Sequence, residues 1–200
     1  MNQVILLHTG SQDMVWEPAL LSGPERKRAA GMRSSQRRLQ YIAGRWALRQ
    51  LCAARSGGDP ALWSFAPEGK PVGCHAWGYL APHLSLSHSG HWVLAASSAS
   101  SCLGVDIEAL GRPRPWADLA RYHGFKAGSA QASERGFLRF WVEHEARYKA
   151  NAKAAPMKRW RLEGPGFVAG LVSEIAAVPA IKVVHPGKRF GPASFIRSSS

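Results

Sequence analysis

Cysteine is scarce in this chain, and its scarcity excludes two classes of protein. The 200 residues hold three cysteines, Cys52, Cys74 and Cys102, which are odd in number and widely spaced. Disulfide-stabilised scaffolds and closed zinc sites need several cysteines at close spacing, so we expect neither. A reducing compartment, the cytoplasm, is the expected location.

Long hydrophobic runs are also missing. No stretch approaches the roughly 20 apolar residues that a membrane-spanning helix needs, and the apolar run at residues 4–7 has no basic leader before it. We therefore expect neither secretion nor a membrane partner. The hydrophobic content of 46% nevertheless suits a globular chain with one sizeable core or two small packed halves.

Acidic residues are few and basic residues are many. The chain has 26 lysines and arginines against 13 aspartates and glutamates, which gives a formal net charge of +13. A surface this positive concentrates polyanions and speeds their encounter with the protein. Three kinds of partner fit: a nucleic acid, a phosphate-rich small molecule such as a nucleotide or coenzyme, and an acidic protein.

Two long amphipathic helices are predicted from apolar residues that recur every three or four positions. The first begins at residue 34 or 35 and ends near 55, and the second begins at 129 or 133 and ends near 153. A shorter basic helix opens at Pro24. In the first long helix Arg38, Arg45 and Arg49 share one edge, where their guanidinium groups could bind phosphates.

Short strands complete the predicted pattern. They are expected at residues 4–8, 84–89, 92–96, 102–107, 158–162, 167–172 and 181–184. The order of strand, long helix and further strands occurs twice, which predicts an α+β fold with two similar α/β halves. We divide the chain into an N-terminal half, residues 1–104, and a C-terminal half, residues 105–200, which holds the second long helix.

Three carboxylates suggest a metal site. In an extended strand Asp106 and Glu108 point to the same face, about 6.5 to 7 Å apart along the chain, and could share one cation, although such a pair alone is usually a solvated face. Glu145 and Lys149 lie one helical turn apart, where the default is a surface ion pair. Their helix edge is half apolar, so we expect it to face another element. Three acidic oxygens suit a hard cation such as Mg²⁺.

Three further residues, one in a loop and two in the predicted hairpin, are considered for ligand binding. Lys70 lies between a glycine and a proline in a loop and is expected to be displayed on the surface. Ser87 and His88 lie at the end of a predicted strand, where Ser87 could bind a phosphate oxygen. An isolated histidine is more often structural than a ligand, and the other histidines lack the spacing of a zinc site.

Taken in order, these motifs resemble one family. Residues 69–71 (GKP), 84–90 (LSLSHSG), 104–108 (GVDIE) and 141–149 (WVEHEARYK) are similar to those of 4′-phosphopantetheinyl transferases, of the monomeric type that activates surfactin synthetase. The similarity covers most of the first 150 positions. It implies a 4′-phosphopantetheinyl transferase-like fold whose halves are related by a pseudo-twofold axis, with coenzyme A between them, and a monomer.

The resemblance also implies a reaction. The 4′-phosphopantetheine arm of coenzyme A passes to a serine of an apo acyl or peptidyl carrier protein, with Mg²⁺, and adenosine 3′,5′-bisphosphate leaves. By this similarity Asp106, Glu108 and Glu145 would hold Mg²⁺, and Lys149 would stabilise the charge developing on the leaving group. The residues that would bind coenzyme A are Lys70, Ser87 and His88, with Arg26, Arg38 or Arg45 at its 3′-phosphate.

Two segments depart from that pattern. Relatives carry a glutamate, a candidate general base, between the D-x-E strand and the long helix, whereas residues 122–128 contain none. The base therefore stays open between Glu108 and a metal-bound water. Relatives also tend to have a glycine pair soon after the lysine, and residues 151–155 have none.

Two other functions remain as alternatives. A basic nucleic-acid-binding module would explain the arginines, but three converging carboxylates would repel a phosphate backbone, so nucleic acid is the less favoured partner. The second alternative is a degenerate family member that binds coenzyme A without transferring anything.

Overall fold

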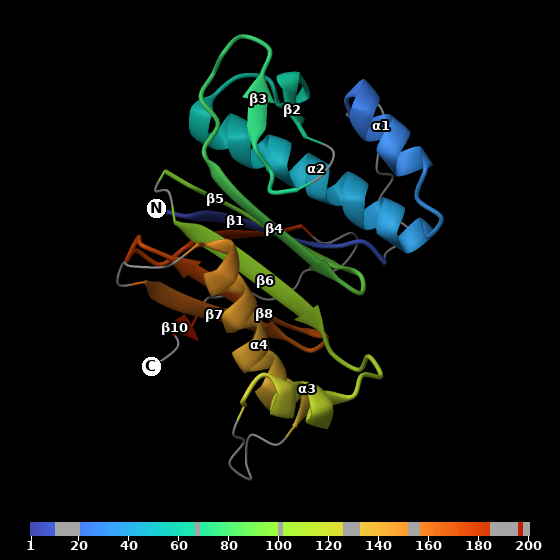
Figure 1. Ribbon diagram of the computed structural model, residues 1–200. Coiled ribbons are helices and arrows are strands. Elements are labelled where there is room, and N and C mark those ends of the chain that lie inside the picture. Colours follow the sequence, from blue (N-terminus) through green and yellow to red (C-terminus); the bar gives the residue numbers. More distant parts are fainter. Residues whose placement is uncertain are drawn as a thin grey trace.

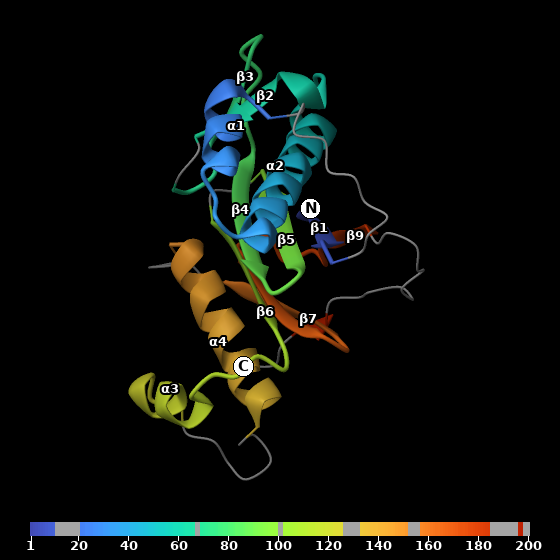
Figure 2. The same ribbon diagram turned by 90° about the vertical axis from the view of Figure 1, so that its right-hand side faces the viewer.

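The computed structural model describes residues 1–10, 21–66, 69–99, 102–125, 133–151, 157–184 and 196–197. Within these residues the protein has a mixed α/β fold in four layers: a helix, a sheet, a second sheet and a second helix (Figures 1 and 2). No helix in this part of the chain combines the length and apolar character needed to cross a membrane.

The first sheet has the strand order β4-β5-β1-β9. Its strands are β1 (Gln3–His8), β4 (His83–Ser89), β5 (Trp92–Ser98) and β9 (Ala180–Val184). β5 pairs antiparallel with β4 and β1, whereas β9 pairs parallel with β1. The long helix α2 (Ser35–Ser56) covers the outer face of this sheet, and α1 (Gly23–Ala30) packs against α2 (Figure 1).

The second sheet has the strand order β10-β7-β8-β6, and its pairs are antiparallel. Its strands are β6 (Leu103–Ala109), β7 (Lys158–Gly164), β8 (Phe167–Ser173) and β10 (Ile196–Arg197). Helix α4 (Glu134–Lys149) covers its outer face, with α3 (Trp116–Tyr122) beside it. The short elements η2 (Pro60–Leu62), β2 (Trp63–Phe65) and β3 (Gly73–His75) follow α2.

Alternating apolar residues on the strands explain the layers. On β1, Ile5 and Leu7 belong to the core beneath α2, whereas Val4 and Leu6 face the second sheet. Val105 and Ile107 of β6 meet them from the other side. The opposite face of β6, which holds Asp106, is consequently turned toward α4.

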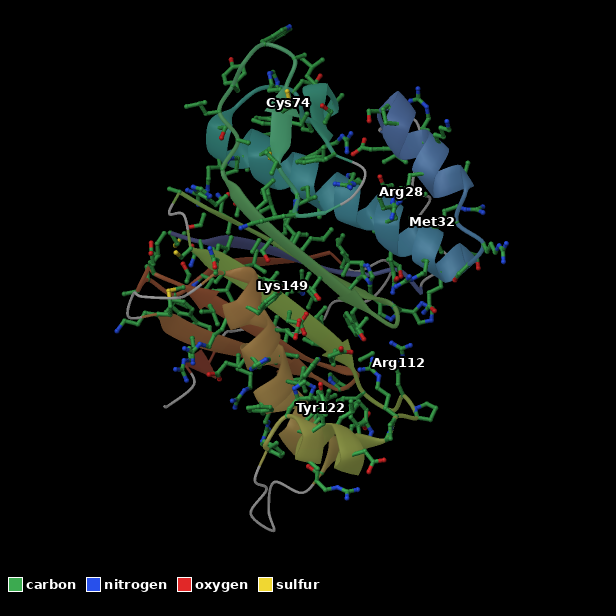
Figure 3. The ribbon with its side chains drawn as sticks, viewed as in Figure 1. Arg28, Met32, Cys74, Arg112, Tyr122 and Lys149 are labelled. Carbon is green, nitrogen blue, oxygen red and sulfur yellow. The ribbon has the colours of Figure 1, made fainter. Side chains whose placement is uncertain are left out.

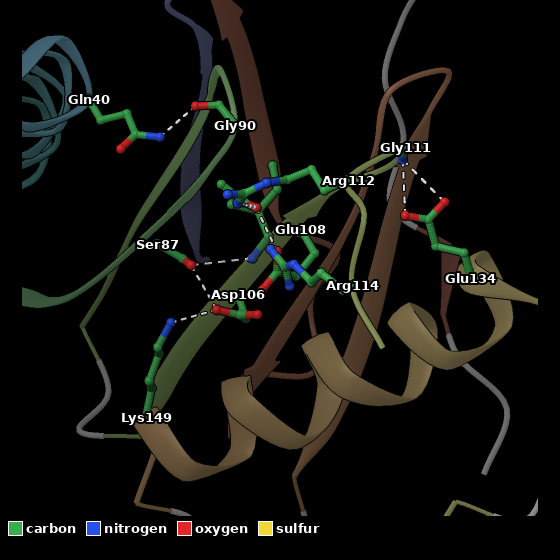
Figure 4. A network of polar contacts seen from close by, with 12 residues as sticks. Gln40, Ser87, Gly90, Asp106, Glu108, Gly111, Arg112, Arg114, Glu134 and Lys149 are labelled. Atoms are coloured by element: carbon green, nitrogen blue, oxygen red, sulfur yellow. Dashed lines mark hydrogen bonds and ion pairs between the residues drawn. The ribbon is translucent and has the colours of Figure 1, made fainter. Parts of the chain in front are cut away.

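Gly104 lets α4 lie directly on β6. A Cβ atom at this position would be 1.8 Å from the carbonyl oxygen of Ala146 and 2.7 Å from the backbone nitrogen of Ala150. Since no side chain fits in that space, only glycine allows the last turn of α4 to approach the strand. The close approach brings Lys149 of α4 next to Asp106 of β6 (Figure 4).

The predicted elements are largely confirmed. Ser34 caps α2 and Ser133 caps α4, each through its hydroxyl, and Pro24 occupies the first turn of α1. Residues 129 and 153, the outer limits predicted for the second long helix, lie outside the described residues. The five short elements η2, α3, β2, β3 and β10 were not predicted.

The division into halves stays a prediction, as does the pseudo-twofold axis. The boundary between residues 104 and 105 falls inside β6, which begins at Leu103. In addition β9, from the C-terminal half, pairs with β1 in the first sheet. Strand β6 therefore crosses the predicted boundary, and the chain returns to the first sheet with β9.

Candidate functional site

The two sheets meet along a seam between β4 and β6, where serines of β4 face the backbone of β6. The hydroxyl of Ser85 accepts a hydrogen bond from the backbone nitrogen of Val105 at 3.0 Å. The hydroxyl of Ser87 accepts one from the backbone nitrogen of Ile107 at 3.4 Å. Serine side chains thus satisfy backbone groups at the edge of the second sheet, where a further strand would otherwise be needed.

Asp106 lies at the centre of this seam and is 5% exposed. Its Oδ1 accepts hydrogen bonds from the hydroxyl of Ser87 at 2.7 Å and from Nζ of Lys149 at 2.6 Å (Figure 4). Burial raises the pKa of Asp106, while the charge and hydrogen bond of Lys149 oppose that rise. Asp106 and Lys149, both predicted site residues, are therefore in direct contact.

Glu108 has different partners from those of Asp106. Its Oε2 accepts hydrogen bonds from the hydroxyl of Ser89 at 2.5 Å and from a guanidinium nitrogen of Arg114 at 2.8 Å (Figure 4). The Arg114 guanidinium also stacks over Trp116, 5.3 Å from the ring centroid. Arg112 donates to Ser89 at 3.5 Å. The loop after β6 thus supplies a cation to the second carboxylate of the D-x-E pair.

The remaining predicted ligand, Glu145, is half-buried on α4, one turn before Lys149. Across the described ranges, no group of three or more histidine, cysteine, aspartate or glutamate side chains is arranged to hold a metal ion. The predicted triad is therefore not assembled as a metal site in this arrangement. One observation fits a cation all the same: Oδ2 of Asp106 is buried and has no hydrogen-bond partner in the described part of the protein.

A cleft of about 1040 Å³ opens beside this seam. Its walls come from the loop 69–71, from β4 and from the last turn of α4 with Asn151. Lys70, exposed as predicted, and Lys149 both line it. Figure 3 shows Lys149 near the middle of the molecule, with Arg28 and Met32 across from it on the side of α1. The cleft can accept an elongated anionic ligand, because both walls carry lysines.

A second pocket of about 780 Å³ meets the cleft at Gly69, which lines both. Cationic side chains dominate its wall: Lys27, Arg28, Arg37 and Arg45, with His88. Partial burial of the His88 ring and the nearby Arg37 charge lower the pKa of this histidine, so its neutral form is favoured at pH 7. His88 is thus on the opposite face of β4 from Ser87, among the cations.

The arginines expected to share one phosphate-binding edge have other roles. Glu25 of α1 is fully buried and pairs with Arg49 at 2.5 Å and Arg45 at 3.5 Å. Arg49 is only 1% exposed, so the prediction that it could reach a phosphate is wrong. A buried carboxylate requires such partners, and these pairs hold α1 against α2.

Arg26 and Arg38, both exposed, form hydrogen bonds to backbone carbonyls. Arg26 donates to Leu21 at 2.5 Å. Arg38 donates to Ala29 in the last turn of α1 at 3.1 Å and to Met32 just after the helix at 2.8 Å. Neither lines the basic pocket, whereas Arg45 does, while also donating to the carbonyl of Ala66 at 2.7 Å. The cations that the structure adds to this pocket are Lys27, Arg28 and Arg37.

Sequence reasoning missed the partners of the carboxylates. Ser85 and Ser89 alternate with Leu84 and Leu86 in the chain, and that alternation was the available signal for a serine face on β4. No sequence pattern around Arg114 indicated that it would pair with Glu108. Glu134 is the first carboxylate after the segment that lacks a general base. Its Oε1 and Oε2 accept hydrogen bonds from the backbone nitrogen of Gly111 at 3.0 and 3.1 Å, which connects the loop after β6 to α4.

Comparison with known proteins gives one informative similarity. No family model matches the chain. The 4′-phosphopantetheinyl transferase HetI of Nostoc sp. strain PCC 7120 is 28% identical to it over an alignment of 144 positions, which covers 66% of this chain. The chain spans about 60% of the length of HetI. This similarity supports the superfamily that the motifs resemble, while the surfactin-synthetase-activating type and the monomeric state stay predictions.

Proposed function

We propose that this protein transfers the 4′-phosphopantetheine arm of coenzyme A to a serine of an apo acyl or peptidyl carrier protein. The observation that carries the proposal is the contact between Lys149 and buried Asp106 beside a cleft lined with lysines. The similarity to a 4′-phosphopantetheinyl transferase supports the same reaction class. Cys52 and Cys74 are free thiols, the second of them exposed, which agrees with a reducing cytoplasm.

The reaction exchanges one phosphorus–oxygen bond for another. The serine oxygen of the carrier attacks the phosphorus that bears the pantetheine arm, its proton passes to a base, and the bond to the bridging diphosphate oxygen breaks. Adenosine 3′,5′-bisphosphate takes the electron pair and leaves. Catalysis of such a step consists mainly of positioning and of stabilising negative charge.

The residues of this chain divide that work between the cleft and the basic pocket. Lys70 and Lys149 would bind the diphosphate in the cleft, where both side chains line the wall. Lys27, Arg28 and Arg37 would take the 3′-phosphate, with neutral His88 beside them. Ser87 is already bonded to Asp106, so we assign it to orienting that carboxylate.

Carboxylate oxygens are the ligands that Mg²⁺ prefers, and the unpartnered Oδ2 of Asp106 would give it a first ligand. Glu108 and Glu145 would complete the set, Glu108 after releasing Arg114. When bound, the ion would neutralise charge on the diphosphate oxygens.

The proposed function is tested by measuring transfer of phosphopantetheine to a carrier protein. Purified protein with Mg²⁺ and coenzyme A is expected to add the mass of one phosphopantetheine group to apo carrier proteins in a panel of acyl and peptidyl types. Lys149→Ala is expected to lower kcat by about 10²- to 10³-fold, because a charge-stabilising donor is lost. Lys182→Ala removes an exposed lysine of β9 and serves as the matched control.

The outcomes separate the competing functions. No mass gain on any carrier would reject the transferase, and tight coenzyme A binding in that case would indicate the degenerate coenzyme A-binding member. A salt-sensitive affinity for generic duplex DNA, without transfer, would indicate the nucleic-acid-binding module.

A further inference from the structure

Gln40 is a polar side chain of α2 that is buried at a distance from the cleft. It is 6% exposed and lines neither the cleft nor the basic pocket. Its Nε2 donates a hydrogen bond to the carbonyl oxygen of Gly90 at 2.5 Å, across 50 positions of the sequence (Figure 4). A buried amide costs folding free energy unless it is hydrogen-bonded, so this bond holds Gly90 at a fixed place beneath α2.

Gly90 opens the two-residue turn between β4 and β5. Ser89 and Trp92 pair at the ends of the two strands, and Gly90 between them has a φ of 58°, which glycine adopts readily. A Cβ atom on Gly90 would lie 2.8 Å from the Cβ of Ala109, the last residue of β6. The turn therefore packs directly on the end of β6, and Gln40 binds it from the side of α2.

The second residue of the turn, His91, is held differently. Its carbonyl oxygen accepts from the backbone nitrogen of Thr9 at 2.7 Å and from the Thr9 hydroxyl at 3.1 Å. Loss of the Thr9 hydroxyl would leave the backbone bond in place. The bond from Gln40 to Gly90 comes from a side chain, so a substitution of Gln40 removes it altogether.

The turn bears on the candidate site through Ser89, the residue just before it. The Ser89 hydroxyl donates to Oε2 of Glu108 at 2.5 Å and accepts from Arg112 at 3.5 Å (Figure 4). A guanidinium group can only donate, so the hydroxyl proton of Ser89 is left for the carboxylate. The position of the turn thus decides whether Ser89 reaches Glu108.

Ser89 and Arg114 bind the same oxygen of Glu108, but a cation would affect them differently. A divalent ion would repel the guanidinium of Arg114, whereas the uncharged Ser89 can keep its hydrogen bond. Hydrogen-bond partners of metal ligands orient those ligands, and the loss of one typically lowers metal affinity by about 10- to 100-fold. Ser89 is therefore the partner that would orient Glu108 toward a bound ion.

We propose that Gln40 is a positioning residue for the metal site. By holding the β4–β5 turn against β6 it places Ser89, and through Ser89 it orients Glu108 toward Mg²⁺. The inference rests on the proposed function, which assigns Glu108 to the metal. In the competing interpretation Gln40 only joins α2 to the hairpin and has no effect on Glu108.

A double-mutant cycle in the full-length protein separates the two interpretations. Gln40→Met keeps the length of the side chain and removes the donor, and Ser89→Ala removes the bond to Glu108. The single and double variants are titrated with Mn²⁺, followed by electron paramagnetic resonance, with and without coenzyme A. The Mg²⁺ concentration that gives half-maximal transfer is measured as well. Thr9→Val, which removes one side-chain bond to the same turn, is the matched control.

Ser89→Ala is expected to weaken Mn²⁺ binding by about tenfold and Gln40→Met by about fivefold. The double variant should bind Mn²⁺ no more weakly than Ser89→Ala alone, because both changes act through one contact. The Mg²⁺ requirement of transfer should rise in the same order, and Thr9→Val should behave as the wild type. Titrations are made well below the lowest melting temperature of the set, so that unfolding does not contribute.

Other results overturn the proposal. A Gln40→Met variant that binds Mn²⁺ as the wild type does, or a double variant in which the two losses add in free energy, shows a structural role while the transferase function stands. If the wild type binds no Mn²⁺ with or without coenzyme A, the metal site of the proposed function fails, and the role of Gln40 fails with it. Should Gln40→Met not fold, Gln40→Asn, whose amide is one methylene shorter, takes its place in the cycle.

Discussion

Asp106 is a carboxylate whose surroundings disfavour its charged form. Burial raises its pKa, Ser87 and Lys149 partly compensate through Oδ1, and Oδ2 is left without a partner. A buried oxygen without a partner costs folding free energy, so a cation bound at Oδ2 would be favourable. The raised pKa and the unpaired oxygen of Asp106 are therefore properties expected of a ligand-binding carboxylate.

Replacing Asp106 with asparagine should separate activity from stability. Asp106→Asn keeps an oxygen that accepts from Ser87 and Lys149 but removes the buried negative charge. We expect transfer to be lost and the melting temperature at pH 7 to equal or exceed that of the wild type. Mass spectrometry of the carrier and thermal denaturation measure the two effects. Asp118→Asn, at an exposed position of α3, is the control.

The raised pKa of Asp106 predicts the direction in which folding stability changes with pH. Since the folded state holds the Asp106 proton more tightly than the unfolded state, the carboxyl's contribution to stability falls as pH rises from about 4, the ordinary aspartate pKa, through the raised pKa. The stability of the wild type relative to Asp106→Asn should fall over that window. A relative stability that rises instead, or a large loss of stability in the variant at pH 7, would contradict this account.

At the scale of elements, the site depends on how closely α4 lies on β6. The motif residues Asp106 and Lys149 are 43 positions apart, and they meet because Gly104 leaves room for the backbone of Ala146 and Ala150. A glycine that had seemed only to precede the D-x-E motif is thus what sets the distance between its carboxylate and the lysine.

Gly104→Ala should therefore disturb both fold and activity. The added methyl would overlap backbone atoms of α4, which cannot move as a flexible side chain could, so we expect a loss of about 1 to 3 kcal/mol in unfolding free energy. Activity should fall as Lys149 moves from Asp106. Denaturant unfolding measures the first effect. Gly23→Ala, where no atom lies within 4 Å of the added Cβ, should be neutral and is the control.

The elements were predictable to the extent that their signals are local. The periodic apolar residues of α2 and α4 and the turn at Gly90 identified helices and a hairpin that the structure confirms. The role of Arg49 was misread because its partner, Glu25, lies 24 residues away on another helix. Arg114 lies close to Glu108 in the sequence, but it was missed because a side-chain pair across an irregular loop leaves no periodic trace.

At the scale of the whole molecule, the parallel pairing of β1 with β9 brings strands from the N-terminal and C-terminal parts of the chain together. β9 covers one edge of β1, and its partly buried Ile181 and Val183 pack against the core between the sheets. The first sheet is therefore complete only when a strand from the C-terminal part has returned to it (Figure 2).

A chain that ends at Pro179 should fold less well than one that ends at residue 190. The shorter chain loses β9 and exposes the backbone edge of β1, so we expect a melting temperature lower by about 5 °C or more and a greater tendency to aggregate. The longer chain loses β10 but keeps β9. Equal melting temperatures for the two chains would show that β9 adds little.

Glu108 and Asp106 each have a cationic partner within the protein itself. Arg114 and Lys149 already serve these carboxylates as built-in counter-ions, so the polypeptide can fold before any divalent ion arrives. If Mg²⁺ binds as proposed, it would take the place of the Arg114 guanidinium at Glu108. A diphosphate that arrives together with the ion would offer the displaced guanidinium a new anion, which would couple the loading of metal to the loading of coenzyme.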